Sequence, residues 1–390
     1  MSTTKPKDLL RNLGLLAGSM ILSLVMAECV VRFLYPQQLA VWHTMPDGLV
    51  IHPPGLDTYL AEFKQQVRFN SLGMRDREHA ADKAEGTTRV LVLGDSFMEA
   101  LQVSFEESFS HRLESRLRKT LGPHVDVINC SVSGWGQDAQ LAYLQKYGRD
   151  LKPDLILVAM TLHNDVLDNM QGRFYSMAQG RLAPVSVPRI SDWEYNTLRI
   201  KGYFASRSHL WQLVRKWKHL GEIREVASAL DRHVLQVVQG GDEPAELQRG
   251  WQVTSELLKG IRDAGKGLGA ETAVMLIPLR YQLEPDSLRK FREAAGVTSG
   301  NAVVDRPQQL MKKLGREAGL EIIDLLPVFQ SQTASAGHSR SDGSLHLQEG
   351  HWNTMGHRLA ANIAADEIVK RQLLNTSLSR RGKRVATPSD

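Results

Sequence analysis

Apolar residues along this chain group into short runs that alternate with longer segments of helical period. The runs are rich in Val, Ile and Leu and lack alternating polar positions, so each predicts a strand buried on both faces. They cover residues 89–93, 125–129, 155–160, 272–278 and 320–325. Between the runs, apolar residues recur at helical spacing, as at residues 105–121, 306–319 and 353–370. Strands separated by helices indicate βαβ units, and we therefore expect a parallel sheet covered by helices.

The N-terminal part of the chain has a different pattern. Residues 13–35 form one apolar stretch of about 23 residues, which is enough to cross a bilayer as a helix. Glu28 and Arg32 interrupt it, and their spacing of four allows them to pair. Basic residues within 1–12 predict a cytoplasmic N-terminus, with everything after the span outside. A cleaved signal peptide ending near Ala27 is the alternative, and the anchor is favoured because the apolar character continues beyond that point.

Four further regions follow the predicted span. Residues 36–86, rich in Pro, Gly and charge, are expected to form a juxtamembrane segment, and residues 87–374 the main domain. Within that domain, residues from about 169 to 265 break the alternation and predict a largely helical insertion. Its aromatic and basic residues fit either a helical cap packed on the domain or a surface for sugar or lipid headgroups. The polar, basic tail at 375–390 is expected to be disordered.

Composition excludes several classes of protein. The chain has 390 residues, of which 42% are hydrophobic and 23% charged, and a net charge of +5, so the bulk is expected to fold. No basic stripe is interleaved with aromatic residues, which argues against nucleic-acid binding. Cys29 and Cys130 are the only cysteines, they are not expected to pair, and no metal-ligand spacing occurs. We therefore expect neither a metal nor another cofactor.

Candidate chemistry begins directly after the first strand, at Ser96. Further polar clusters follow the second and third strands and precede the last helix, and the corresponding loops of a parallel sheet open on one edge. A serine hydroxyl needs an adjacent base, and His351 is the histidine that topology places best. The oxyanion of a tetrahedral intermediate needs donors, which the N–H groups of Ser96 and Gly134 and the amide of Asn164 supply. These residues together predict a serine nucleophile with an oxyanion hole.

The motifs resemble those of the SGNH hydrolase superfamily, also called GDSL-type esterases and lipases. The matching residues are Gly94-Asp95-Ser96, Gly134, Asn164-Asp165 and His351. The resemblance implies a three-layer α/β/α sandwich with a parallel, flavodoxin-like sheet, with Ser96 as nucleophile and His351 as base. The order of anchor and domain is similar to membrane-anchored bacterial members linked to surface polysaccharide modification.

One position departs from the pattern of that superfamily. The usual acid lies three residues before the histidine, where this chain has Gln348. Glu349, two residues before His351, is the expected acid, because some related sequences carry Asp at that position. Asp342 is a second candidate, and a Ser–His dyad oriented by a backbone carbonyl is a third possibility.

These observations lead to one main hypothesis and two alternatives. The main one is a single-pass protein of the bacterial inner membrane, with a periplasmic serine esterase domain that acts on O-acyl groups, of which O-acetyl is one example, on envelope glycans or lipids. The first alternative is an O-acyltransferase that modifies an extracytoplasmic polysaccharide. The second is a non-catalytic scaffold that binds the proteins of a polysaccharide assembly complex.

Overall fold

The fold was analysed in a computed structural model of the full chain. The residues that this structure describes are 6–37, 39–162, 164–185, 191–217, 245–294, 303–335, 344–347 and 350–374. The C-terminal tail predicted at 375–390 therefore lies outside the described residues.

The centre of the molecule is a parallel sheet of five strands. They are β5 (Thr88–Gly94), β6 (Val125–Ser131), β7 (Leu155–Thr161), β10 (Glu271–Ile277) and β11 (Glu321–Asp324). Their order in space is β11-β10-β7-β5-β6, and every neighbouring pair is parallel. Numbered along the chain, this is the order 2-1-3-4-5 of flavodoxin-like sheets. The predicted fold class is confirmed.

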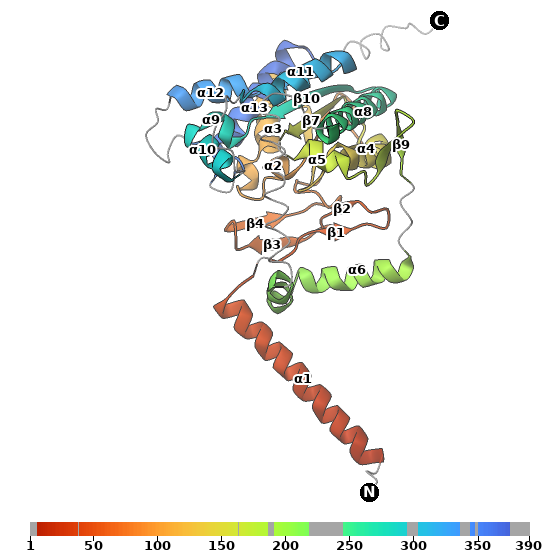
Figure 1. The fold of residues 1–390 in the computed structure, drawn as a ribbon. Coiled ribbons are helices and arrows are strands. Elements are labelled where there is room, and N and C mark those ends of the chain that lie inside the picture. Colours follow the sequence, from red (N-terminus) through yellow and green to blue (C-terminus); the bar gives the residue numbers. More distant parts are fainter. Residues whose placement is uncertain are drawn as a thin grey trace, which may run out of the picture.

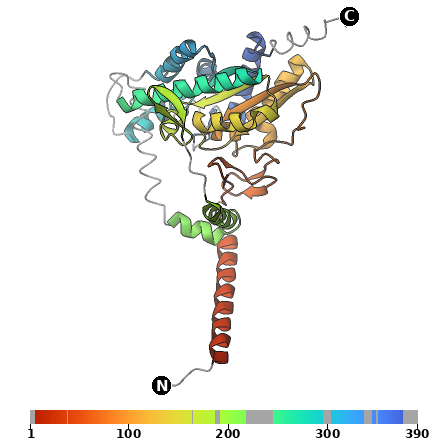
Figure 2. The ribbon, with the colours of Figure 1, turned by 90° about the vertical axis from the view of Figure 1, so that its right-hand side faces the viewer.

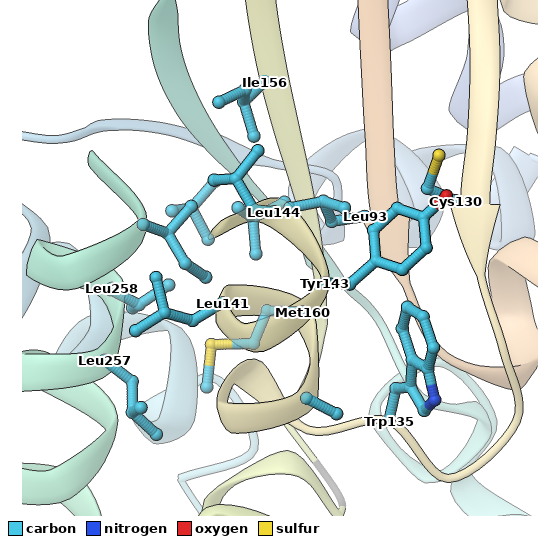
Figure 3. Packing of buried hydrophobic residues seen from close by; sticks show 14 of the residues in the cluster. Leu93, Cys130, Trp135, Leu141, Tyr143, Leu144, Ile156, Met160, Leu257 and Leu258 are labelled. Carbon is cyan, nitrogen blue, oxygen red and sulfur yellow. The ribbon is translucent and has the colours of Figure 1, made fainter. Parts of the chain in front are cut away.

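Helices cover both faces of this sheet (Figure 1). One face carries α4 (Gln137–Leu151), α8 (Ala245–Leu268) and α11 (Arg306–Ala318), and the other carries α3 (Phe109–Leu121) and α13 (Thr354–Lys370). Figure 3 shows the first layer, where side chains from α4 and α8 meet those of the strands. Burying one leucine of this kind contributes about 2–3 kcal/mol. The two apolar layers therefore hold the strand ends in fixed positions.

Shorter helices line the carboxyl ends of the strands. They are α2 (Ser96–Glu99), the 3₁₀ turn η1 (Phe105–Glu107), α5 (Asp165–Met170), α9 (Arg280–Leu283), α10 (Pro285–Ala294) and α12 (Leu326–Ser335). In Figure 1, α2, α5, α9 and α10 all lie on the side of the sheet that faces α1. The carboxyl edge of the sheet is therefore turned toward the N-terminal helix.

The predicted juxtamembrane segment folds into two small hairpins between α1 and the carboxyl edge of the sheet (Figure 1). One pairs β1 (His43–Thr44) with β2 (Val50–Ile51), and the other pairs β3 (Asp57–Leu60) with β4 (Gln65–Arg68).

Beyond these hairpins, His79 ties the segment to the domain through ring contacts to Asp76 (3.0 Å) and Asp126 (2.9 Å). Burial lowers the pKa of His79, but its hydrogen bonds to the two carboxylates outweigh burial and raise this pKa to about 9.

Among its described residues, the region predicted as a helical insertion contains a hairpin as well as helices. It begins with a hairpin of β8 (Tyr175–Ala178) and β9 (Arg181–Pro184), which helical periodicity did not predict. Then come α6 (Asp192–Ala205) and the helical residues 209–217. The last element, α8, packs on α4 and β10 and is the crossover helix between β7 and β10. The prediction that assigned α8 to the insertion is corrected, because its apolar face completes the core.

Most of the N-terminal helix α1 (Pro6–Leu34) extends away from the domain (Figure 2). Its apolar part is Leu10–Leu34, with a mean hydropathy of 2.0, and is long and apolar enough to cross a membrane. A signal sequence has the same properties. Glu28 and Arg32 form the predicted pair, with 3.1 Å between carboxylate oxygen and guanidinium nitrogen.

Candidate active site

Ser96 is the first residue of α2, directly beyond the carboxyl end of β5. The preceding Asp95 is buried, and its Oδ1 accepts a hydrogen bond from the N–H of Phe97 (3.0 Å), which caps the short helix. Gly94 has no space for a side chain, because a Cβ there would lie 2.5 Å from Cγ of Met98. The tight passage from strand to helix presents the Ser96 side chain at the edge of the sheet. Asp95 acts as a cap, as expected for a residue that bonds its own loop.

His351 reaches Ser96 from the loop before α13. Its Nε2 lies 2.8 Å from Oγ of Ser96, at hydrogen-bond distance for a hydroxyl that donates to an imidazole nitrogen. The neighbouring Trp352 is fully buried and packs edge-on against Phe97, with ring centroids 5.3 Å apart. Asn353 then caps α13, its Oδ1 accepting from the second and third N–H groups of that helix. A buried ring on one side of His351 and a capped helix therefore fix the position of the imidazole.

Gly134 lies in a turn after β6. The N–H of Trp135 donates to the carbonyl of Val132 (3.1 Å), so Gly134 is the third residue of a β-turn. Its φ of 80° is the left-handed conformation that such a turn needs at this position and that favours glycine. No atom lies within 4 Å of where a Cβ of Gly134 would be. The backbone here is open to an approaching ligand atom.

A buried carboxylate, Glu99, holds the turn that contains Gly134. Glu99 is the last residue of α2 and is fully buried. Its Oε2 accepts hydrogen bonds from the N–H (3.0 Å) and the hydroxyl of Ser133. Its Oε1 pairs with Nε2 of His52, and Nδ1 of the same ring donates to the carbonyl of Val41 (2.7 Å). One carboxylate therefore connects the serine helix, the glycine turn and the juxtamembrane segment.

Arg75 fixes the other side of α2. Its buried guanidinium donates to the carbonyls of Glu99 (3.1 Å), Ala100 and Val103 (2.5 Å). Burial lowers the pKa of Arg75 to about 10, so it stays protonated at neutral pH. Sequence reasoning assigned no role to Glu99, His52 or Arg75, because their partners are distant along the chain.

Asn164 lies beside Asp95, the neighbour of Ser96. Its Nδ2 donates to Oδ2 of Asp168 (2.8 Å), and its side chain also hydrogen-bonds Asp95. The adjacent Asp165 is buried, and its Oδ2 accepts from Gln137 (2.7 Å) and from the backbone N–H of residue 161 (3.0 Å). Burial and then the charge of Asp95 raise the pKa of Asp165. Asn164 is thus in the site, and its role as an oxyanion donor stays a prediction.

The candidate acids Glu349 and Asp342 lie outside the described residues, as does Gln348. Two other histidines lie near the site, His346 and His357, and both are buried. Burial lowers their pKa values to about 4 and about 3, so both rings are neutral at pH 7.

Ser96 and His351 are each partly exposed, and two cavities of about 490 and 440 Å³ lie elsewhere, beside α6 and beside α5. Within the described residues, no group of three or more His, Cys, Asp or Glu side chains is placed to hold a metal ion.

Comparison with known families gives a match to the C-terminal part of the chain. A family model described as "SGNH hydrolase-like domain, acetyltransferase AlgX" matches residues 238–387. The match includes His351 and does not reach Ser96, so it bears only on the histidine side of the candidate site. A comparison with curated proteins gave no match.

Solved structures give distant likenesses. The acetyl xylan esterase AlAXEase is 10% identical, with a TM-score of 0.41 over 72% of this chain and 99% of that one. A variant of Axe2, an acetyl-xylooligosaccharide esterase from a Geobacillus species, is 13% identical, with a TM-score of 0.39 over 74% of this chain and 96% of that one. TesA is 16% identical, with a TM-score of 0.36 over 74% of this chain and all of that one. At TM-scores this low, none of the three bears on the activity.

Proposed function

We propose that the chain is a serine esterase of the SGNH hydrolase superfamily that reacts through an acyl-enzyme. The observation that carries the proposal is the 2.8 Å hydrogen bond between Ser96 Oγ and His351 Nε2. A nucleophile and a base within hydrogen-bond reach are the minimum that acyl transfer needs. Residues 255 positions apart meet here, and each is held by its own set of buried contacts.

The proposed mechanism has two halves. Ser96 Oγ attacks the ester carbonyl while His351 Nε2 takes the hydroxyl proton, and the intermediate collapses when that proton passes to the departing alcohol. In the second half, His351 Nε2 takes a proton from water as the water attacks the acyl-enzyme. The proton then passes to Ser96 Oγ, and the acid is released. Donors from Ser96 N–H, Gly134 N–H and Asn164 stabilise the oxyanion, each by about 3 kcal/mol. Glu349, or Asp342 in its place, orients the imidazole.

The proposed substrates are O-acyl esters, acetyl esters first, on carbohydrates or lipids of the cell envelope. Two observations support this class. The matching family model describes an acetyltransferase, so acetyl is the group associated with it. The carboxyl edge of the sheet, with Ser96, also faces the side of the molecule that carries α1 (Figure 1).

An O-acyltransferase is the second candidate, and the description of the family model favours it specifically. The acyl-enzyme is the same in both candidates, and only the second acceptor differs: water for an esterase and a sugar hydroxyl for a transferase. Partners in a polysaccharide assembly complex belong to this second candidate and to a non-catalytic scaffold.

Labelling with a fluorophosphonate probe tests the chemistry. The full chain in detergent should be labelled, and Ser96→Ala should not, while Ser133→Ala, a serine in the neighbouring turn, should still be labelled. No labelling of the wild type, or equal labelling of Ser96→Ala, would support the scaffold and refute an acyl-enzyme. A radiolabelled acetyl ester supplied together with glycan then separates the candidates. Free acetate as the main product supports the esterase, and acetylated glycan in excess of acetate supports the transferase.

We further propose that α1 is an uncleaved anchor in the bacterial inner membrane with the domain in the periplasm. Its last turns are bonded to the domain, since Arg32 donates to the carbonyl of Arg207 (2.6 Å) as well as pairing with Glu28. A reporter enzyme active only in the periplasm, fused after Asp390, should be active. Activity of a cytoplasm-only reporter at the same position would contradict this orientation.

A further inference from the structure

Two helical segments of the insertion expose an apolar surface beside the end of α1. They are α6 and residues 209–217, here called the helical platform, and both lie across the end of α1 in two perpendicular views (Figures 1 and 2). On α6, Trp193, Ile200 and Phe204 follow a spacing of seven and then four, which places them on one face. They are 76%, 59% and 46% exposed. The opposite face, with Ala205, packs on the domain, where Ala40 N–H donates to the Ala205 carbonyl (2.9 Å).

Contacts of Glu28 fix the position of the platform along the axis of α1. Its carboxylate accepts hydrogen bonds from the N–H groups of His209 (3.0 Å) and Leu210 (2.9 Å), at the start of the second segment. Glu28 lies six residues before Leu34, where the apolar stretch ends. At a rise of about 1.5 Å per residue, this contact lies about 9 Å inside the apolar stretch.

That depth corresponds to the boundary between headgroups and acyl chains. The apolar stretch Leu10–Leu34 has 25 residues and so a length of about 37 Å, which exceeds the hydrocarbon thickness of about 30 Å. Its last turns therefore emerge into the interfacial layer, and the platform bonded to them lies at the same level.

The side chains of the platform match this environment. Residues 192–217 contain five basic and two acidic side chains. The second segment adds Trp211 (39% exposed) and Trp217 (75% exposed) to the aromatic residues of α6. Tryptophan and tyrosine are enriched at membrane interfaces, and interfacial helices combine such rings with Arg and Lys.

We propose that the helical platform lies on the phospholipid bilayer that α1 enters, with its exposed aromatic and aliphatic side chains at the level of the headgroups. The proposal rests on the anchoring of α1 and is independent of the chemistry at Ser96. When α1 spans the bilayer, a surface held at this depth contacts lipid. The bilayer contact then fixes the orientation of the domain, so that the carboxyl edge of the sheet stays near the membrane.

Quenching of tryptophan fluorescence by brominated lipids tests the proposal with the full chain. The chain is reconstituted in phosphatidylcholine nanodiscs whose acyl chains carry bromine near the headgroup, or in unbrominated discs. No tryptophan lies in α1, so quenching reports only on the rest of the chain. Three of the seven tryptophans lie in the platform, and roughly 40% of the emission should therefore be lost.

The comparison variants are the triple Trp193→Phe, Trp211→Phe, Trp217→Phe and the control Trp251→Phe, which removes a buried ring of α8. We expect the quenched share to fall at least threefold in the triple variant and not to fall in the control. Equal quenching of wild type and triple variant, with the chain retained in the disc, would overturn the platform proposal alone. Loss of the chain from the discs would refute both the anchor and the platform.

Discussion

Replacing Glu99 tests whether this side chain positions the turn that contains Gly134, as distinct from only stabilising the fold. In Glu99→Ala, the N–H and hydroxyl of Ser133 and Nε2 of His52 lose their buried acceptor. Each of these three groups left without a partner costs about 1–3 kcal/mol, so the expected loss of unfolding free energy is about 3–9 kcal/mol. The turn at Gly134 then loses its support. If its N–H leaves the oxyanion position, kcat should fall about 10²- to 10³-fold.

Glu99→Gln is the matched control. Glu99→Gln keeps the length of the side chain and both of its polar positions, beside Ser133 and beside Nε2 of His52. The side-chain amide nitrogen that this substitution introduces can donate to that Nε2, and the amide oxygen can still accept from Ser133. We therefore expect Glu99→Gln to keep kcat within about threefold of the wild type, since geometry, rather than charge, holds the turn.

Hydrolysis of p-nitrophenyl acetate provides the assay, with kcat and KM measured at a temperature where near-ultraviolet circular dichroism shows a folded domain. A lost oxyanion donor lowers kcat and leaves KM nearly unchanged. The reasoning is refuted if folded Glu99→Ala keeps kcat within threefold. It is also refuted if Glu99→Gln loses as much activity as Glu99→Ala, because the charge would then be the essential property.

Three further predictions concern the site and its supports. Asn164→Ala should lower kcat about 10²- to 10³-fold in the same assay, and an unchanged kcat would remove this amide from the oxyanion hole. Because the pKa of His79 is raised to about 9 in the folded chain, its stabilisation is complete below pH 6.5 and is lost as the pH rises through 9. Urea unfolding should show a fall on the order of 3 kcal/mol across that range, and His79→Gln should flatten it. Gly356→Ala should cost about 1–3 kcal/mol and reduce activity, because its Cβ would lie 2.4 Å from the Leu345 carbonyl oxygen in the loop leading to His351. Gly267→Ala in α8, with no atom within 4 Å of the added Cβ, is the control and should be neutral or stabilising in a thermal melt.

The serine and the histidine could be placed from the sequence because each lies beside a strong local pattern. Ser96 follows an apolar strand that ends in glycine, and His351 precedes an amphipathic helix whose first residues Asn353 caps. Both patterns are encoded within about ten residues, and parallel topology then requires the two loops to share an edge. Their hydrogen bond is what that topology predicts.

The supports of the site could not be placed in this way. Glu99 and His52 are an ordinary acidic residue in a turn and an ordinary histidine in a loop until the juxtamembrane hairpins pack on the sheet edge. Helical period likewise did not separate α8, which is part of the core, from α6, which is not. Both are amphipathic, and only the tertiary contacts show which apolar face meets protein.

The sequence by itself therefore determined the alternation of strands and helices, the parallel sheet and the two residues proposed for chemistry, because buried strands and one-sided helices have periods that a short window reveals. The tertiary structure alone decided what holds those residues, how the N-terminal segment joins the site, and which helices stay exposed beside α1. Those features depend on pairs such as Glu28 with His209 and Glu99 with His52, whose partners meet only after folding.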